Sequence, residues 1–154
     1  MKQLNKLDGS IRKSKFKEHE CIFSCPICGN KMHNKDYKDL VCLQGHSFNI
    51  AKTGYVNFLG RPPKTEYNQE LFQARQIISE SGFFKPLLEC ISQVIIAALK
   101  TREPENTAIL DAGCGEGSHL GQIIGALDTG EILGVGIDIV KEAEELGFEL
   151  IGTD

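Results

Sequence analysis

The sequence predicts an α/β protein in which a small zinc-binding, β-rich knuckle is followed by a Rossmann-like domain. Three observations support this fold class. Cysteine and histidine recur at metal-ligand spacing early in the chain, a glycine-rich turn joins an apolar run to a helical pattern, and an acidic residue ends the next apolar run. The residues are, in that order, Cys25, Cys28, Cys42 and His46, then Asp111 to Gly117, then Asp138.

The composition is that of an ordinary soluble globular protein. Of 154 residues, 41% are hydrophobic and 25% are charged, and this length fits one domain with a small appendage. No apolar run approaches the roughly 18 residues that span a bilayer, and the first residues lack the apolar core of a signal peptide. We therefore expect a cytoplasmic protein that does not enter membranes. Its six cysteines are expected to be ligands or buried thiols rather than disulfides.

Charge is distributed unevenly along the chain. Residues 1–64 carry 12 Lys and Arg against 5 Asp and Glu, whereas residues 65–154 carry 5 against 16. A basic front segment on an acidic body favours a polyanionic partner, such as a nucleic acid, for the front segment alone. The alternative is that these lysines only keep a short segment soluble, and charge by itself does not decide between the two.

Changes in composition divide the chain into four segments. Residues 1–20 are polar and lysine-rich and are expected to form a loose basic tail, and residues 21–59 form the zinc-binding module. Residues 60–68 contain Gly-Arg-Pro-Pro and are predicted to be a linker, because two adjacent prolines continue neither a helix nor a strand. Residues 69–154 then carry the α/β domain.

Apolar periodicity locates the elements of that domain. Apolar residues three and four apart predict two helices, the first of them ended by Gly82. Short apolar runs predict strands on either side of the glycine-rich turn. The predicted helices are Gln69–Ser81, Lys85–Lys100, His119–Leu127 and one that begins with Lys141–Leu146, and the predicted strands are Thr107–Leu110 and Ile132–Ile139.

The cysteine and histidine pattern has the spacing of a structural zinc site. Cys25 and Cys28 are separated by two residues, and Cys42 and His46 follow after thirteen intervening residues. Three thiolates and an imidazole make a closed tetrahedral set with no open position for catalysis. A module of this size has a small core, so zinc would contribute much of its stability. Cys21 is the less favourable ligand because the later two cysteines form the better-spaced pair.

The glycine-rich turn indicates a nucleoside cofactor. The pattern Asp-x-Gly-x-Gly-x-Gly, from Asp111 to Gly117, lies between a strand and a helix, where such a turn lets the backbone approach a ligand closely. Ser118 stands where a dinucleotide motif has its third glycine, so S-adenosylmethionine is the favoured cofactor. A glycine turn that binds nothing is the alternative. Cys114 has no evident base that would make it a nucleophile.

Each residue of the turn has an expected role toward the cofactor. Asp111 is expected to hold the turn near the amino group of the methionine part, and Glu116 to lie beside the cofactor. Asp138, 21 residues after the last glycine, is expected to accept hydrogen bonds from the ribose hydroxyls. The N–H groups of the glycines are expected to face the cofactor, these being Gly113, Gly115 and Gly117.

Several stretches between about Phe23 and Lys141 match one pattern. They are Cys25-Pro-Ile-Cys28, Cys42-Leu-Gln-Gly-His46-Ser-Phe48, Ala51-Lys-Thr-Gly-Tyr-Val-Asn57, Gln73-Ala-Arg75, Ser81-Gly-Phe-Phe-Lys-Pro-Leu87 and Leu110-Asp-Ala-Gly-Cys-Gly-Glu-Gly117. Together they resemble the bacterial 23S ribosomal RNA (guanine-N1)-methyltransferases. The zinc motif with the Gly-Tyr-Val-Asn stretch is more specific than the glycine turn.

The resemblance implies a structural zinc ion on the Cys₃His set and S-adenosylmethionine near Gly115, Glu116 and Asp138, with Phe84 touching the cofactor. It implies methyl transfer to N1 of a guanine in a 23S rRNA hairpin, which the zinc module would bind through phosphates. No catalytic residue can be assigned. Candidates for the phosphate contacts are Lys31, Lys35, Lys38, Lys52, Arg61 and Lys64.

The resemblance also implies that residues 69–154 form only the N-terminal part of a class I methyltransferase domain, which would make this a partial, truncated enzyme. Two other functions stay open. One is a non-catalytic zinc module that binds RNA and keeps a vestigial cofactor turn, and the other is a small-molecule methyltransferase with an unrelated zinc appendage. A homodimer is a further open expectation.

Overall fold

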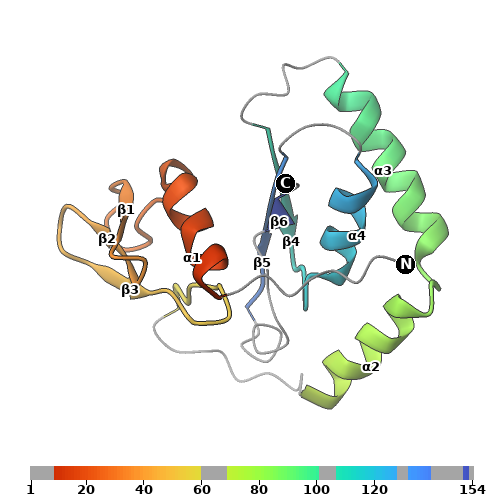
Figure 1. Ribbon diagram of the computed structural model, residues 1–154, viewed down its shortest axis with the longest axis horizontal. Helices are drawn as coiled ribbons and strands as arrows, with labels where there is room; N and C mark the ends of the chain where they lie inside the picture. Colours follow the sequence, from red (N-terminus) through yellow and green to blue (C-terminus); the bar gives the residue numbers. More distant parts are fainter. Residues whose placement is uncertain (1–8, 60–68, 101–106, 128–131, 140–150, 153–154) are drawn as a thin grey trace. The chain divides into compact units, whose positions relative to one another are not determined.

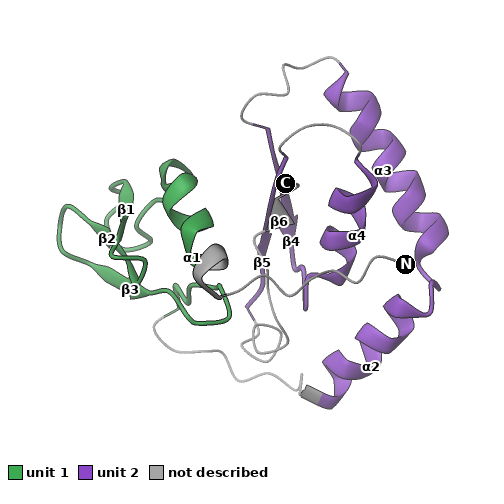
Figure 2. Ribbon diagram, viewed as in Figure 1, with its two compact units in different colours: residues 1–61 green, residues 62–154 purple. Residues whose placement is uncertain are grey.

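The computed structural model describes residues 9–59, 69–100, 107–127, 132–139 and 151–152 (Figure 1). The chain divides into two compact units, residues 1–61 and 62–154 (Figure 2). The predicted linker, residues 60–68, and the helix predicted from Lys141 lie outside the described residues.

Unit 1 is built on a three-stranded antiparallel sheet. β1 (Met32–Lys35) pairs with β2 (Asp39–Cys42), which pairs with β3 (Ser47–Asn49). The turn from β1 to β2 has two consecutive residues with positive φ, Asp36 at 54° and Tyr37 at 57°. Paired positive φ values match the twist of a tight hairpin, so the register of the sheet follows from this turn. The largest buried side chains of the unit are Phe16, Met32, Leu40 and Ile50.

A helix precedes this sheet where a loose tail was predicted. α1 (Gly9–Glu18) leads into a short 3-10 turn, η1 (Glu20–Ile22). Phe16 is only 4% exposed and stacks on Phe23, with ring centroids 5.5 Å apart. The prediction of a loose tail is therefore wrong for residues 9–18. A helix this short gains its stability from tertiary packing, which periodicity does not reveal.

Glu20 ties this N-terminal segment to the sheet. Its carboxylate accepts a hydrogen bond of 2.9 Å from Nζ of Lys17 and one of 2.8 Å from the backbone N–H of Asn34 in β1. Because one side chain joins the end of α1 to the first strand, the helix has a polar as well as an apolar attachment.

Unit 2 is a mixed α/β region. Its elements are, in chain order, α2 (Gln69–Glu80), α3 (Lys85–Leu99), β4 (Ala108–Ala112), α4 (Ser118–Ala126), β5 (Leu133–Ile137) and β6 (Ile151–Gly152). β4 and β5 are parallel, with α4 between them in the chain, and β6 pairs antiparallel with β5. The bounds of the five predicted elements agree with these to within two residues.

The core of unit 2 lies between the helices and one face of the sheet. In Figure 1, α3 and α4 lie on the same side of β4 and β5. The buried residues of α4 are spaced three and four apart, so they form one face of the helix. The core contains Leu120, Ile124, Leu127 and Ile132, against which Ile95, Ile96, Leu99 and Ile109 pack.

A tight turn separates α2 from α3. Gly82 has a φ of 81° and ends α2, as predicted.

Among the described helices, none is long and apolar enough to cross a membrane by itself. α2 and α3 meet that test of length and composition only when taken together, and they are bent by 76° at their junction.

Candidate metal centre and cofactor pocket

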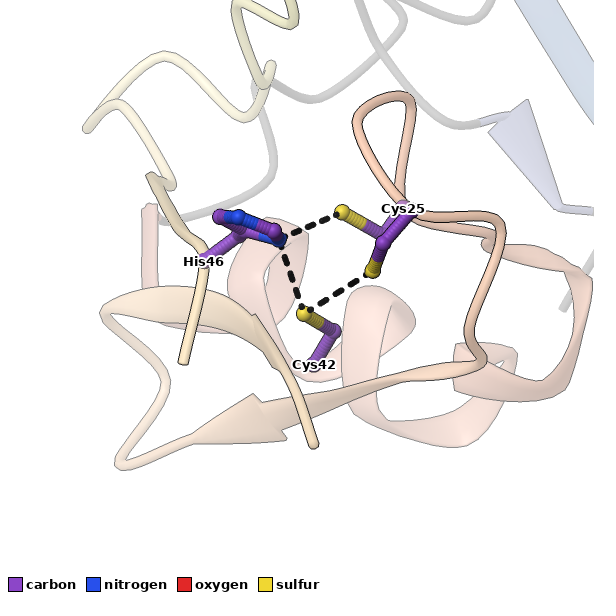
Figure 3. A group of neighbouring side chains, drawn as sticks. Cys25, Cys42 and His46 are labelled. Atoms are coloured by element: carbon purple, nitrogen blue, oxygen red, sulfur yellow. Dashed lines mark hydrogen bonds between the residues drawn. The ribbon is translucent and has the colours of Figure 1, made fainter. Parts of the chain in front are cut away.

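The four predicted zinc ligands come together in unit 1. Nδ1 of His46 lies 3.5 Å from Sγ of Cys25 and 3.5 Å from Sγ of Cys42 (Figure 3). Sγ of Cys28 lies 3.7 Å from Sγ of Cys42, and all four ligand atoms lie within 4.8 Å of one another. A tetrahedron with Zn–S of about 2.3 Å and Zn–N of about 2.0–2.1 Å places its ligand atoms about 3.5–3.8 Å apart. The three distances between 3.5 and 3.7 Å therefore agree with a tetrahedral Cys₃His zinc site.

Two turns that contain glycine hold these ligands. Gly29 has a φ of 71° and donates its N–H to the carbonyl of Cys25 at 2.8 Å. Gly45 has a φ of 82° and donates to the carbonyl of Cys42 at 2.9 Å. Each turn therefore folds the backbone back on the cysteine that begins it. Cys21 is exposed and lies outside the cluster, so the choice of ligands by spacing agrees with the geometry.

The backbone also prepares one thiol for metal binding. Burial opposes ionisation of Cys25, but hydrogen bonds from the backbone N–H groups of Ile27 and Cys28 and from the thiols of Cys28 and Cys42 together lower the pKa of Cys25 to about 6. The hydrogen bonds of the site therefore favour the thiolate form of Cys25, the form that binds metal.

The predicted cofactor residues gather where β4 and β5 end in unit 2. Parallel neighbouring strands end at the same edge of a sheet, so the turn after β4 meets the residues after β5. The three glycines of the turn have φ values of 88°, 59° and 78°, in the left-handed region that glycine adopts without steric cost. They are Gly113, Gly115 and Gly117. Backbone conformation therefore explains why the turn uses glycine three times.

The N–H groups of these glycines have acceptors within the protein. The pairs are Gly113 with the carbonyl of Ile137 at 2.8 Å, Gly115 with Oδ2 of Asp138 at 2.9 Å, and Gly117 with the carbonyl of Cys114 at 3.0 Å. These bonds hold the turn in shape, and the contact of the N–H groups around the three glycines with a cofactor stays a prediction. Two of the acceptors lie at the end of β5, on Ile137, and directly after it, on Asp138.

A pocket of about 160 Å³ lies beside the glycine turn. Phe84 and His119 line it, with their rings packed edge to face at a centroid distance of 4.8 Å. Five of the residues expected at the cofactor line this pocket, namely Phe84, Asp111, Gly113, Gly115 and Glu116. Gly117 and Asp138 lie outside its described lining. Gly117 instead precedes the first residue of α4, and Asp138, which follows β5, accepts a hydrogen bond from Gly115 of the turn.

Sequence reasoning missed two polar residues of the pocket, Arg75 and His119. α2 reaches the turn through Phe72, which is 1% exposed and lies 3.6 Å from the position that a Cβ on Gly115 would occupy. Arg75 follows three residues after Phe72, so both lie on one side of the helix. That spacing could have indicated Arg75, but only once the partner of α2 was known.

Cys114 is buried inside the turn. Burial, together with the nearby carboxylates of Asp138 and Asp111, raises the pKa of its thiol to about 12. The thiol therefore stays protonated at neutral pH, in agreement with the expectation that Cys114 is not a nucleophile.

Comparison with known proteins identifies the family of the zinc-binding module. Residues 23–64 match the family model described as RlmA, N-terminal, a zinc ribbon. The chain carries the zinc ribbon of the RlmA family. This match includes all four residues of the Cys₃His cluster.

Three bacterial proteins are similar to this chain. YxjB of Bacillus subtilis (strain 168), provisionally named as a 23S rRNA (guanine-N(1)-)-methyltransferase, is 44% identical over 124 residues, which cover 79% of this chain and 43% of YxjB. A protein of Micromonospora griseorubida with the same provisional name is 33% identical over a stretch that covers 77% of this chain and 44% of that protein. The 23S rRNA (guanine(748)-N(1))-methyltransferase of Streptomyces fradiae is 32% identical over a stretch that covers 77% of this chain and 41% of that enzyme. Together with the ribbon, these relatives confirm the predicted resemblance to the 23S rRNA (guanine-N1)-methyltransferases. The chain spans less than half the length of each relative.

Proposed function

We propose that this chain takes part in the S-adenosylmethionine-dependent transfer of a methyl group to N1 of a guanine in 23S rRNA. The observation that carries the proposal is the presence, in one chain, of an RlmA zinc ribbon and a three-glycine turn bonded to an acidic residue. The names of three relatives, each similar over more than three quarters of this chain, support the same reaction. The cytoplasmic location and the homodimer stay predictions.

The residues around the turn fit S-adenosylmethionine. When bound, this cofactor supplies an electrophilic methyl group. Asp138 would accept hydrogen bonds from the ribose hydroxyls, because its carboxylate lies against the turn at Gly115 and accepts a hydrogen bond there. Phe84 offers an apolar ring in the pocket, and Asp111 and Glu116 would attract the ammonium group. The parallel β4–α4–β5 unit supports a Rossmann-like arrangement of the domain.

The zinc ribbon would bind the RNA. Four of the lysines expected to contact phosphates are exposed in unit 1, namely Lys31, Lys35, Lys38 and Lys52. Arg61 and Lys64 lie outside the described residues. Phosphate contacts would position the RNA without reading its sequence. The target guanine must leave its base pair or stack before its N1 can react.

The deciding experiment combines cofactor binding, RNA binding and methyl transfer. The chain is incubated with S-adenosylmethionine carrying a labelled methyl group, with and without a 23S rRNA transcript, and both binding steps are measured separately. We expect label at N1 of a guanine only when RNA is present. RNA binding without cofactor binding would contradict the proposal and favour a non-catalytic zinc module. Methyl transfer that does not need RNA would favour a small-molecule methyltransferase.

Replacing the four exposed lysines by glutamine tests the RNA-binding surface. Each lost phosphate contact is expected to reduce the slope of log K against log salt by about 0.7 for single-stranded RNA. The matched control replaces Lys85 and Lys100 of unit 2, which are also exposed. An equal loss of RNA binding in both variants would contradict the assignment of RNA binding to the ribbon.

A further inference from the structure

We propose that Arg75 is a positioning residue that binds the carboxylate of the amino-acid part of the cofactor. The inference rests on the proposed function, because it assigns one end of the same ligand. The pocket beside the glycine turn contains charges of both signs, with Asp111 and Glu116 on the turn and Arg75 on α2. At neutral pH, the methionine part of S-adenosylmethionine carries an ammonium and a carboxylate. The two acids suit the ammonium, and a guanidinium suits the carboxylate.

Arg75 is the cation available for this contact. Of the described side chains that line the pocket, it alone carries a permanent positive charge. Within the described part of the chain it forms no ion pair, so its charge is not neutralised by Asp111 or Glu116. An arginine in a pocket that also contains two carboxylates, yet pairs with neither, can bind an incoming anion with its planar fork.

The backbone of α2 holds Arg75 in place from both sides. Phe72, three residues earlier, is buried against the turn at Gly115. Ser79, four residues later, is 2% exposed and binds two side chains of α4, accepting from Oγ of Ser118 at 3.1 Å and from Nε2 of Gln122 at 3.0 Å. Residues 72, 75 and 79 lie on one face of the helix. Arg75 therefore projects from a fixed segment of α2, beside the turn.

A second group in the pocket lacks a partner. Nε2 of His119 is buried without a hydrogen-bond partner among the described residues, and the ring packs edge-on against Phe84. Buried polar nitrogens are normally paired. In the tautomer with a proton on Nε2, His119 would donate a hydrogen bond to the carboxylate that Arg75 holds. The pocket thus has two donors for one anionic group.

The test compares two ligands that differ only in this carboxylate. Binding of S-adenosylmethionine and of decarboxylated S-adenosylmethionine to the whole chain is measured by titration calorimetry. We expect the unmodified chain to bind the first ligand about tenfold more tightly, the usual order for a hydrogen bond to a charged group. Arg75→Met should weaken binding of S-adenosylmethionine about tenfold and leave binding of the decarboxylated ligand unchanged.

Two further variants separate this role from a general effect of charge. Arg75→Lys keeps a point charge without the fork and should show an intermediate loss. Lys100→Met, which follows α3 and lies outside the pocket lining, should bind both ligands like the unmodified chain. Circular dichroism of each variant checks the fold.

The outcomes distinguish this inference from the function on which it rests. The role of Arg75 would be overturned if Arg75→Met weakened the binding of both ligands equally, or if the unmodified chain bound both with equal affinity. The proposed cofactor would stay in place in either case. Failure of the unmodified chain to bind either ligand would overturn both.

Discussion

The carboxylate of Asp138 accepts a hydrogen bond of 2.9 Å from the backbone N–H of Gly115. The two residues are 23 positions apart, and they meet because β4 and β5 are parallel neighbours that end at the same edge. Gly115 has a φ of 59°, so the bond stabilises a left-handed backbone in the middle of the turn. Asp138 therefore shapes the turn in addition to the role toward ribose that we propose for it.

Asp138→Ala is expected to lower the free energy of unfolding by about 1 kcal/mol, because the N–H of Gly115 loses its acceptor. It should also weaken binding of S-adenosylmethionine. Asp138→Asn keeps an acceptor oxygen and should recover most of the stability, whereas its affinity stays reduced because the charge is lost. Urea unfolding and calorimetry measure the two effects. The control is Glu89→Ala on the exposed side of α3. Unchanged stability in Asp138→Ala would contradict the structural role.

Cys42→Ser should abolish stoichiometric zinc binding, because it removes one of the four ligands that lie within 4.8 Å of one another. The matched control is Cys21→Ser, which changes an exposed cysteine of the same unit outside the cluster. We expect one zinc per chain in the control and less than one in Cys42→Ser, as measured by elemental analysis after dialysis. Loss of zinc in the Cys21 variant would show that the ligand set is wrong.

Removing zinc with a chelator should unfold unit 1 and leave α2, α3 and α4 helical. Structural zinc contributes roughly 10–16 kcal/mol in small zinc modules, and the core of this one is small. Because Phe16 of α1 packs on Phe23, α1 should melt together with the sheet. The helical signal in the far-UV circular dichroism spectrum should therefore decrease only by the contribution of α1. Loss of all helical signal would contradict the independence of the two units.

Cys114 should resist alkylation in the native protein. Burial first, and then the charges of Asp138 and Asp111, raise the pKa of its thiol to about 12. Iodoacetamide at pH 8 should modify the exposed Cys21 and Cys90, and mass spectrometry should find Cys114 modified only after denaturation. Rapid modification of Cys114 in the folded chain would be the contrary result.

The same shift predicts a loss of stability at high pH. The folded state keeps the Cys114 proton above the ordinary thiol pKa of 9.0, whereas the unfolded state releases it. The contribution of this group is thus fully present below pH 9 and is lost as the pH rises toward about 12. Cys114→Ala should show a smaller decrease in the free energy of unfolding over this range. Equal decreases in both proteins would contradict the shift.

Local patterns predicted the elements on which both sites are built. The spacing of Cys25, Cys28, Cys42 and His46 identified the metal ligands, because a tight turn brings two residues of a Cys-x-x-Cys pair to one ion whatever surrounds it. The helices before the turn were predicted to within a residue at each end, since Gly82 and the apolar period act locally. The helix α1 was not predicted, because its packing depends on a contact between Phe16 and Phe23.

The sequence by itself determined the ligands of the metal site, the glycine turn and the family to which the ribbon belongs. These features depend on residue type and on short spacing, which the chain carries before it folds. The tertiary structure alone decided that Asp138 bonds to Gly115 and that Arg75 and His119 face one pocket with the turn. Such contacts join residues far apart in the chain, and strand pairing and helix packing determine which of them form.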